Sequence, residues 1–225
     1  MILDKDGIVF AHITEFMRKI RRQRSGELGS LEHSARKAGY PIVDPETSDL
    51  LEILCRIKKP VRILEIGTCI GFSSLLMLNA SPLSEIITIE RNPAMISPAK
   101  ENFARFSAEK IRLLEGDAAD ILPTFTEKFD FIFLDAAKGQ YPLFLKECLR
   151  LLEKGGVLVC DNVLFNGRVV TKIPDIRRNK TIINRLSSFL EDLESELSVK
   201  TVILPISDGV TVSVKEECTD EKALP

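Results

Sequence analysis

Short apolar runs rich in β-branched residues alternate with helical patterns from Val61 onward, and this alternation limits the possible folds more than any other feature. Runs such as FDFIFLD and GVLVCD lack polar alternation, as expected of strands that are buried on both faces of a parallel sheet. Strands that alternate with helices predict an α/β fold with a doubly wound, mostly parallel sheet. The five candidate parallel strands are Val61–Ile66, Glu85–Glu90, Ile111–Glu115, Phe129–Leu134 and Val157–Cys160.

The C-terminal part of the chain adds an antiparallel ending to this sheet. The runs Lys200–Leu204 and Val210–Val214 are joined by the turn ISDG, which is short enough for an antiparallel hairpin. The complete sheet should therefore have seven strands. Helices are expected between the strands and before the hairpin, at Phe72–Leu78, Pro93–Phe106, Tyr141–Leu152 and Thr181–Leu197.

Residues 1–57 differ from the rest because they show helical patterns without strands. We interpret them as a helical extension packed on one end of the sheet, and residues 58–225 as the core of the same single domain. The expected helices are Phe10–Arg24, Leu31–Ala38 and Pro45–Ile57, separated by Gly26, Gly29, Gly39 and Pro41.

The composition is that of a soluble protein inside a cell. The formal net charge is −2, which gives no general attraction to nucleic acid or to an anionic membrane. No apolar stretch approaches the roughly 20 residues that span a bilayer, and the N-terminus MILDKDG carries acids where a signal peptide has basic residues. The five cysteines have no CxxC spacing, so we expect reduced thiols and a cytoplasmic location.

Three successive strand ends carry groups that suit a nucleoside ligand. Gly67 and Gly71 follow the first strand and open a helix, where backbone amides can face an anion. Glu90 ends the second strand, where an acid can accept both ribose hydroxyls. Asp117 closes the third strand, where it could border an adenine or could instead cap the following helix. Each feature alone has a plain structural explanation, and their order along the sheet favours the nucleoside.

Oxygen ligands follow the fourth and fifth strands. Asp135 ends one strand, and Asp161 and Asn162 end the next, so adjacent parallel strands should bring them to one edge. Two carboxylates and an amide suit a hard cation such as Mg²⁺, although each Asp could also be a turn or helix cap. Lys138 lies three residues after Asp135. A nearby divalent cation would disfavour the charged form of this lysine, and a neutral amine could then accept a proton from a substrate hydroxyl.

These segments together resemble the cation-dependent O-methyltransferase family that includes catechol and caffeoyl-CoA methyltransferases. The resemblance covers about residues 41–215 and is carried by LEIGTCIGFSS, TIERNP, EGDAAD, FIFLDAAKGQY and CDNVLFNGRV. It implies a Rossmann-like class I methyltransferase fold, the cosubstrate S-adenosylmethionine, Mg²⁺, and a homodimer. The residues that it places at the site fall into four groups. Glu65 and Gly67 would shape the cofactor turn, while Val43 and Ser73 would hold the methionine end of the cofactor. Glu90 would hold the ribose, and Asp117 with Ala118 would border the adenine. The metal would be held by Asp135, Asp161 and Asn162, and Lys138 would be the base.

Within this family, DAAKGQY, DNVLFNGRV and PISDGVTVSVK look most like bacterial tRNA 5-hydroxyuridine methyltransferases, which make 5-methoxyuridine at the wobble position. A tRNA substrate is therefore expected, with small catechol-like or caffeoyl phenols as the alternative, because these enzymes share the catalytic residues. Phe165 could stack on a base. Two basic clusters could contact phosphates or could be solvated helix faces. They are Arg18, Lys19, Arg21, Arg22 and Arg24, and Lys172, Arg177, Arg178 and Lys180.

Two other classes of function compete with this prediction. The first is a nicotinamide oxidoreductase, against which the missing third glycine of the dinucleotide fingerprint counts. The second is a non-catalytic nucleoside- or RNA-binding module, which would need neither the oxygen ligands nor Lys138.

Overall fold

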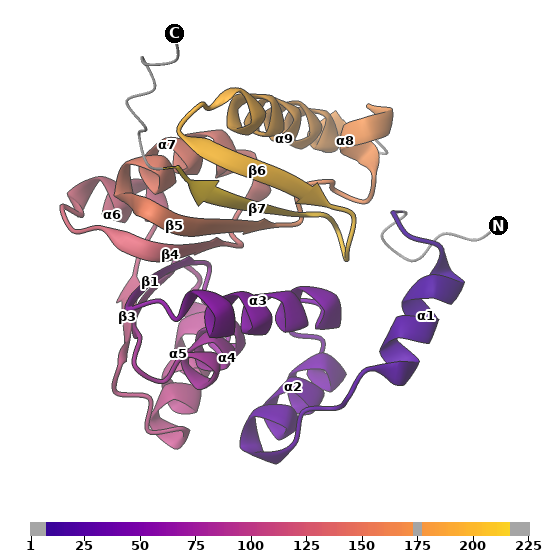
Figure 1. The fold of residues 1–225 in the computed structure, drawn as a ribbon. Helices are drawn as coiled ribbons and strands as arrows, with labels where there is room; N and C mark the ends of the chain where they lie inside the picture. The colour runs from indigo at the N-terminus through magenta and orange to yellow at the C-terminus, as the bar shows by residue number, and fades with distance from the viewer. Residues whose placement is uncertain (1–7, 173–176, 217–225) are drawn as a thin grey trace, which may run out of the picture.

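A seven-stranded sheet organises the computed structural model, which describes residues 8–172 and 177–216. The strand order is β3-β2-β1-β4-β5-β7-β6 (Figure 1). Strands β1 to β5 are parallel, while β7 runs antiparallel between β5 and β6. The predicted doubly wound sheet with an antiparallel C-terminal hairpin is confirmed. The strands are β1 Arg62–Ile66, β2 Glu85–Glu90, β3 Ile111–Glu115, β4 Phe129–Leu134, β5 Leu152–Asp161, β6 Val199–Leu204 and β7 Val210–Lys215.

Strand β5 begins earlier than the predicted Val157. Its first residue, Leu152, pairs with Phe129, but the next pair is Phe131 with Val157, so the register shifts between them. The residues between these pairs include Gly155, whose φ of 68° favours glycine. Because this Glu-Lys-Gly-Gly stretch has the composition of a turn, the sequence pattern concealed an irregular strand.

The helices were predicted more accurately in the core than in the extension. Helix α2 begins at Gly26 instead of Leu31 and runs through Gly29, while α1 ends at Ile20 instead of Arg24. The short helices α6 and α8 were not predicted. The helices are α1 Ala11–Ile20, α2 Gly26–Ala38, α3 Pro45–Lys58, α4 Phe72–Ala80, α5 Pro93–Arg105, α6 Ala118–Ile121, α7 Tyr141–Leu151, α8 Arg168–Thr171 and α9 Arg177–Ser195, with 3₁₀ turns η1 Leu122–Thr124 and η2 Lys138–Gln140.

Helices cover both faces of the sheet, and this explains the continuous apolar runs. In β4, Phe131 and Phe133 join one core, whereas Ile132 and Leu134 join the other. The first core includes side chains from α2, α3, α4 and α5, and the second includes side chains from α7 and α9. Successive strand residues point to opposite faces, so every position in this strand from 131 to 134 is buried.

The three helices of the N-terminal extension pack differently: α2 and α3 lie against the sheet, whereas α1 stands apart from it (Figure 1). Leu31 and Ala35 of α2 and Leu51 and Cys55 of α3 are buried in the same core as Ile63 of β1. These two helices therefore pack over a face of the sheet, not at its end as the sequence suggested. Helix α1 stands apart from the sheet beside α2 and α3 (Figure 1).

Two expectations drawn from the composition concern the state of the cysteines and the presence of a membrane-spanning helix. The four described cysteines are free, with Cys55, Cys148 and Cys160 buried and Cys69 half-buried; Cys218 lies outside the described residues. Within residues 8–172 and 177–216, no helix combines the length and the apolar character that crossing a bilayer requires.

Candidate active site

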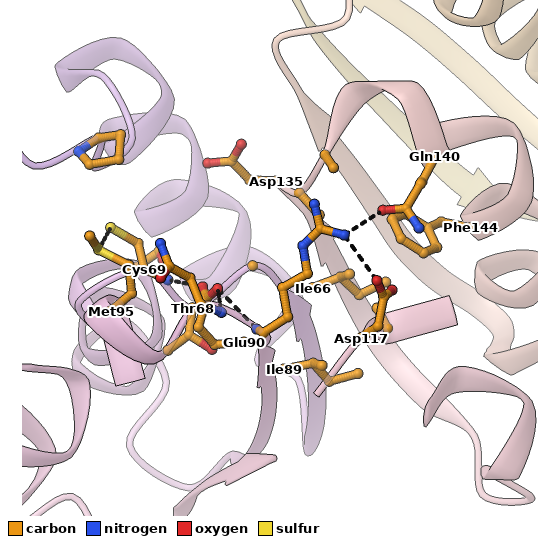
Figure 2. Close-up of a pocket in the computed structure, with 18 of the residues that line it drawn as sticks. Ile66, Thr68, Cys69, Ile89, Glu90, Met95, Asp117, Asp135, Gln140 and Phe144 are labelled. Carbon is orange, nitrogen blue, oxygen red and sulfur yellow. Dashed lines mark hydrogen bonds and ion pairs between the residues drawn. The ribbon is translucent and has the colours of Figure 1, made fainter. Parts of the chain in front are cut away.

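A cavity of about 350 Å³ lies at the carboxyl ends of β1 to β4. This is the crevice where the chain order reverses, because β2 lies on one side of β1 and β4 on the other. Figure 2 shows Glu90, Asp117 and Asp135 around it, each from the end of a different strand. Eight of the predicted site residues line the cavity: Val43, Gly67, Ser73, Glu90, Asp117, Ala118, Asp135 and Lys138.

The glycine turn after β1 is required by a close approach of two backbones. Gly67 has a φ of 105°, and a Cβ atom added there would lie 2.0 Å from the carbonyl oxygen of Asp135. Gly71 precedes α4 with a φ of 83°, and a Cβ there would meet the ring of Phe103 at 2.5 Å. The turn therefore lets β1 and β4 close on each other and begins α4 beside Ser73 in the cavity wall.

Glu65 lies beneath this turn and is not part of the cavity wall. Its side chain is fully buried, and its Oε2 accepts hydrogen bonds from the hydroxyls of Ser74 and, at 2.6 Å, Thr88. Its other oxygen has no hydrogen-bond partner among the described residues. Burial raises the pKa of the Glu65 carboxyl to about 7 despite these hydroxyl donors. Its visible role is to join β1, β2 and α4 under the turn.

Glu90 is held rigidly at the cavity by three backbone amides. Its Oε1 accepts hydrogen bonds from the amides of Arg91 at 3.0 Å and Asn92 at 2.8 Å. Its Oε2 accepts one from the amide of Cys69 at 2.9 Å (Figure 2). Each carboxylate oxygen keeps acceptor capacity, because an ionised carboxylate offers about four lone-pair sites. The carboxylate is therefore positioned in advance to accept two hydroxyl groups.

Asp117 caps the helix that follows β3 and also lies at the cavity, where its predicted place beside an adenine stays a prediction. Its Oδ1 accepts a hydrogen bond from the amide of Ala119 at 2.9 Å and so caps α6, while the residue also lines the cavity. Its Oδ2 pairs with Nη1 of Arg91 at 2.9 Å, and the same nitrogen lies 3.3 Å from Oε1 of Gln140 (Figure 2). The bond from Ala119, followed by Arg91, holds the pKa of the Asp117 carboxyl below its usual value. Arg91 was not predicted, because only the folded turns bring its partners together.

The predicted oxygen ligands meet at the ends of β4 and β5. Leu134 and Cys160 are paired in the sheet, so Asp135 and Asp161 follow at neighbouring positions. Asp161 is only 2% exposed, and its Oδ1 accepts a hydrogen bond from the amide of Asn162 at 2.7 Å. Burial and the negative charge of Asp135 raise the pKa of Asp161 well above its usual value. A buried carboxyl beside a partly exposed one makes the ionisation of Asp161 unfavourable without a nearby positive charge.

Neighbouring polar groups complete this end of the site. Nζ of Lys138 lies 3.3 Å from Oδ1 of Asp135, in a pair that is partly exposed. The hydroxyl of Thr47, at the start of α3, lies 3.5 Å from Oδ1 of Asp161. The phenol of Tyr141 donates to the backbone carbonyl of Asp161 at 2.8 Å. Thr47 was missed because it lies 114 positions from Asp161 and belongs to no recognisable motif.

The described residues contain no group of three or more His, Cys, Asp or Glu side chains arranged to hold a metal. The predicted metal ligands Asp135, Asp161 and Asn162 include only two side chains of these four types, because the third ligand is an amide. They therefore do not form such a group. Asn162 adopts a left-handed φ of 57°, directly after the strand end. Asp135 borders the cavity, whereas Asp161 and Asn162 lie beside it and outside its wall.

The predicted basic surface at the N-terminus is largely neutralised within the chain. Arg18, Arg21 and Arg24 form ion pairs with acidic residues of α2 and α3, while Lys19 and Arg22 are exposed. Three of its five cations therefore already have counter-charges within the chain, and a phosphate contact of this cluster stays a prediction. In the second cluster Lys172 and Lys180 are exposed, and the side chains of Arg177 and Arg178 lie outside the described part of the structure. Phe165 is covered by the guanidinium of Arg168 at 5.5 Å from its ring centre.

Comparison with known proteins agrees with this geometry. Residues 28–216 match the model of a family described as O-methyltransferase. A catechol O-methyltransferase from Niastella koreensis is 31% identical over 170 residues, covering 72% of this chain and 77% of the relative. Tricin synthase 2 from rice, Oryza sativa subsp. japonica, is 29% identical over 215 residues, covering 91% of this chain and 70% of the relative.

Solved structures show the same fold with ligands bound. Podospora anserina methyltransferase PaMTH1, bound to S-adenosylhomocysteine, has a TM-score of 0.82 at 27% identity and covers 92% of this chain and 94% of its own. TomG from Streptomyces achromogenes, an O-methyltransferase of tomaymycin synthesis in complex with S-adenosylmethionine, has a TM-score of 0.77 at 26% identity and covers 96% of this chain and 100% of its own. With most of its length matched by the family model and a strand-end cavity of this geometry, the chain belongs to the O-methyltransferase family.

Proposed function

We propose that this O-methyltransferase takes a methyl group from S-adenosylmethionine bound in the strand-end cavity and transfers it to a hydroxyl oxygen held beside a divalent cation. The observation that carries the proposal is the Glu90 carboxylate, which three backbone amides fix at the cavity wall. A carboxylate at this strand end is suited to the two hydroxyls of a ribose. The adenosine-containing ligands of PaMTH1 and TomG support the same donor here.

The donor can be laid along the cavity from one strand end to the next. With the ribose on Glu90, the adenine would border Asp117 and Ala118 after β3. The methionine end would then reach the turn after β1, where Ser73 and the backbone of Val43 line the wall. This direction brings the sulfonium methyl group toward Asp135 and Lys138, on the neighbouring strand end.

Asp135, Asp161 and Asn162 fit a divalent cation by their chemistry. They supply two carboxylates and an amide oxygen, which suit a hard ion such as Mg²⁺ that keeps several of its waters. Nζ of Lys138 lies 3.3 Å from Oδ1 of Asp135. Burial, together with the negative charge of Asp135, raises the pKa of Asp161, and a cation bound between the two carboxylates would favour their ionised forms. A bound divalent cation would stabilise negative charge on the acceptor oxygen and so make its proton easier to remove.

Lys138 is proposed to remove that proton. Its amine lies at the cavity beside Asp135, which orients it toward the end where the methyl group would be presented. As the oxygen attacks, the carbon–sulfur bond breaks, the new carbon–oxygen bond forms, and the hydroxyl proton passes to an unprotonated Lys138 amine. The products are the methyl ether, S-adenosylhomocysteine and the protonated lysine.

The acceptor is proposed to carry two neighbouring oxygens, because such a pair chelates one cation. A catechol has this arrangement, and the relatives named catechol O-methyltransferase and tricin synthase favour small phenols. The 5-oxygen and O4 of 5-hydroxyuridine give the same arrangement. The sequence segments DAAKGQY and DNVLFNGRV favour this second acceptor, in tRNA. We expect any tRNA contact to use residues beyond the N-terminal arginines, because three of those are already paired.

One assay separates these acceptors. Purified protein would receive labelled S-adenosylmethionine and Mg²⁺, with either tRNA from cells that lack 5-methoxyuridine or a panel of catechol and caffeate derivatives. On the resemblance of the two motifs we expect label in tRNA at 5-hydroxyuridine. Label in the phenols alone would exclude the tRNA proposal and leave O-methylation standing, whereas label in neither would contradict the proposed class of acceptor.

A homodimer and a cytoplasmic location stay predictions. Helix α1 offers a surface for the homodimer, because Ile13, Phe16 and Ile20 lie at helical spacing and are 40%, 60% and 66% exposed. A ten-residue helix is not stable in isolation, and we propose that a second copy of the chain covers this apolar side. A solution mass equal to one chain would exclude this arrangement.

A further inference from the structure

A regular ladder of ion pairs joins the N-terminal segment to α3. Arg18 pairs with Glu46 at 2.7 Å, Arg21 with Asp49 at 2.7 Å, and Arg24 with Glu52 at 3.0 Å. The arginines and the acids both recur every three residues. Because opposite charges meet at each step, the last turn of α1 and the residues that follow it are held along α3 by charge.

Two arginines of this ladder, Arg21 and Arg24, also meet one buried acid of α2, which Arg36 contacts as well. Glu32 is 6% exposed and accepts hydrogen bonds from Arg21 at 3.2 Å, Arg24 at 3.0 Å and Arg36 at 3.1 Å. Burial alone would raise the pKa of the Glu32 carboxyl, but the arginines outweigh it and hold the pKa below its usual value. Glu32 is therefore an ionised centre that orients three guanidinium groups.

Arg36 connects this centre to the cavity. Its Nη2 donates to Oε1 of Glu32 and also, at 2.7 Å, to the backbone carbonyl of Val43. Val43 and its neighbours Pro41 and Ile42 form the part of the cavity wall that comes from the α2–α3 connection. A charged donor on a backbone carbonyl limits where this connection can lie. Arg36 thus links the cavity wall to the N-terminal ladder through Glu32.

We propose that Arg36 is a positioning residue for the donor: with Glu32, Arg21 and Arg24, it holds the backbone of Val43 against the amino-acid end of the ligand. The inference rests on the proposed binding of S-adenosylmethionine. It assigns the N-terminal extension a part in setting the affinity for the donor, although none of the arginines Arg21, Arg24 and Arg36 lines the cavity. It also predicts different effects on the two ends of the ligand, because Glu90 and Asp117 would hold the nucleoside without a contribution from Arg36.

Two ligands test this separation by calorimetry. S-adenosylhomocysteine has the amino-acid end, whereas 5′-methylthioadenosine has the nucleoside and sulfur without it. Replacing Arg36 with methionine should weaken S-adenosylhomocysteine about tenfold, the scale of one lost charged hydrogen bond, and change 5′-methylthioadenosine less than twofold. Arg36→Lys should recover part of the affinity, because its ammonium can still donate to the carbonyl. Arg22→Met is the matched control, since Arg22 is an exposed arginine of the same N-terminal extension.

The outcomes distinguish this inference from the function on which it rests. If the wild-type protein binds neither ligand, the proposed donor is wrong and the inference fails with it. If the wild type binds both, unchanged S-adenosylhomocysteine affinity in Arg36→Met would overturn the inference alone, and so would an equal loss for both ligands. Should Arg36→Met not fold, Glu32→Gln serves instead, because it keeps the shape of the side chain and weakens its hold on Arg36. It should show the same difference between ligands.

Discussion

Replacing Asp161 with alanine is expected to abolish methyl transfer while leaving the protein folded. The carboxylate is one of two that face the proposed cation, and no other described acid joins them in a metal-binding group. Loss of one of three protein ligands, together with the charge stabilisation of the acceptor oxygen, should lower turnover by roughly 10³-fold or more. The measurement is labelled methyl transfer with Mg²⁺ across a range of concentrations, compared with wild-type protein in excess EDTA.

The fold should tolerate this change for a specific reason. Tyr141 donates to the backbone carbonyl of Asp161, so this bond remains in the alanine variant. Removal also takes away a carboxyl whose pKa is raised by burial and by repulsion from Asp135. The melting temperature without metal should therefore not fall in parallel with activity. Asp192→Ala, an exposed change on α9, is the control. Full turnover of the wild type in EDTA, with metal removal verified, would contradict the cation proposal.

Replacing Lys138 with alanine is expected to lower turnover about 10²–10⁴-fold, the usual contribution of a general base. Its amine lies 3.3 Å from Asp135 at the end of the cavity where methyl transfer is proposed. Affinity for S-adenosylhomocysteine should change little, because Glu90 and the β1 turn hold the donor independently. The measurement is the turnover number at saturating donor and acceptor, together with calorimetric affinity for each variant.

A second substitution separates proton transfer from charge pairing. Arg at position 138 can still pair with Asp135 but does not give up its proton in proteins. Lys138→Arg should therefore be nearly as inactive as Lys138→Ala. Lys146→Ala, at an exposed position on α7, should be fully active. Normal turnover of Lys138→Arg would show that the lysine contributes charge and not a proton acceptor.

The site was predictable where strand order alone determines position. The carboxyl ends of parallel strands share one edge of the sheet, so the sequence alone placed Glu90, Asp117 and Asp135 together. The core helices were predictable because the spacing of their apolar residues indicates which side of each helix is buried. The bulged start of β5 was not, since Gly155 and Gly156 have the composition of a turn although the chain continues into the sheet.

The N-terminal extension shows that sequence patterns do not reveal tertiary contacts. Gly29 was taken as a break, yet it lies inside α2, where an added Cβ would meet the carbonyl oxygen of Arg24 at 2.1 Å. The arginines of the N-terminal segment could be phosphate contacts or a solvated helix face in the sequence, and neither interpretation included their acidic partners, which lie 28 positions away. A charge cluster in a sequence does not reveal whether its counter-charges are in the same chain. Arg36 was overlooked because its contact with the cavity wall is made to a backbone carbonyl.

Calorimetry with S-adenosylhomocysteine measures binding of the donor product in this cavity and needs neither the acceptor nor the metal. We expect the wild-type protein to bind one ligand per chain. Replacing Glu90 with alanine should weaken that binding by about 1–3 kcal/mol, the scale of lost hydrogen bonds to a charged group. The variant should remain folded, since this carboxylate is partly exposed and bonds only to backbone amides of nearby turns. No binding by the wild type, or equal affinity in a folded Glu90→Ala variant, would contradict the assignment of this cavity to the methyl donor.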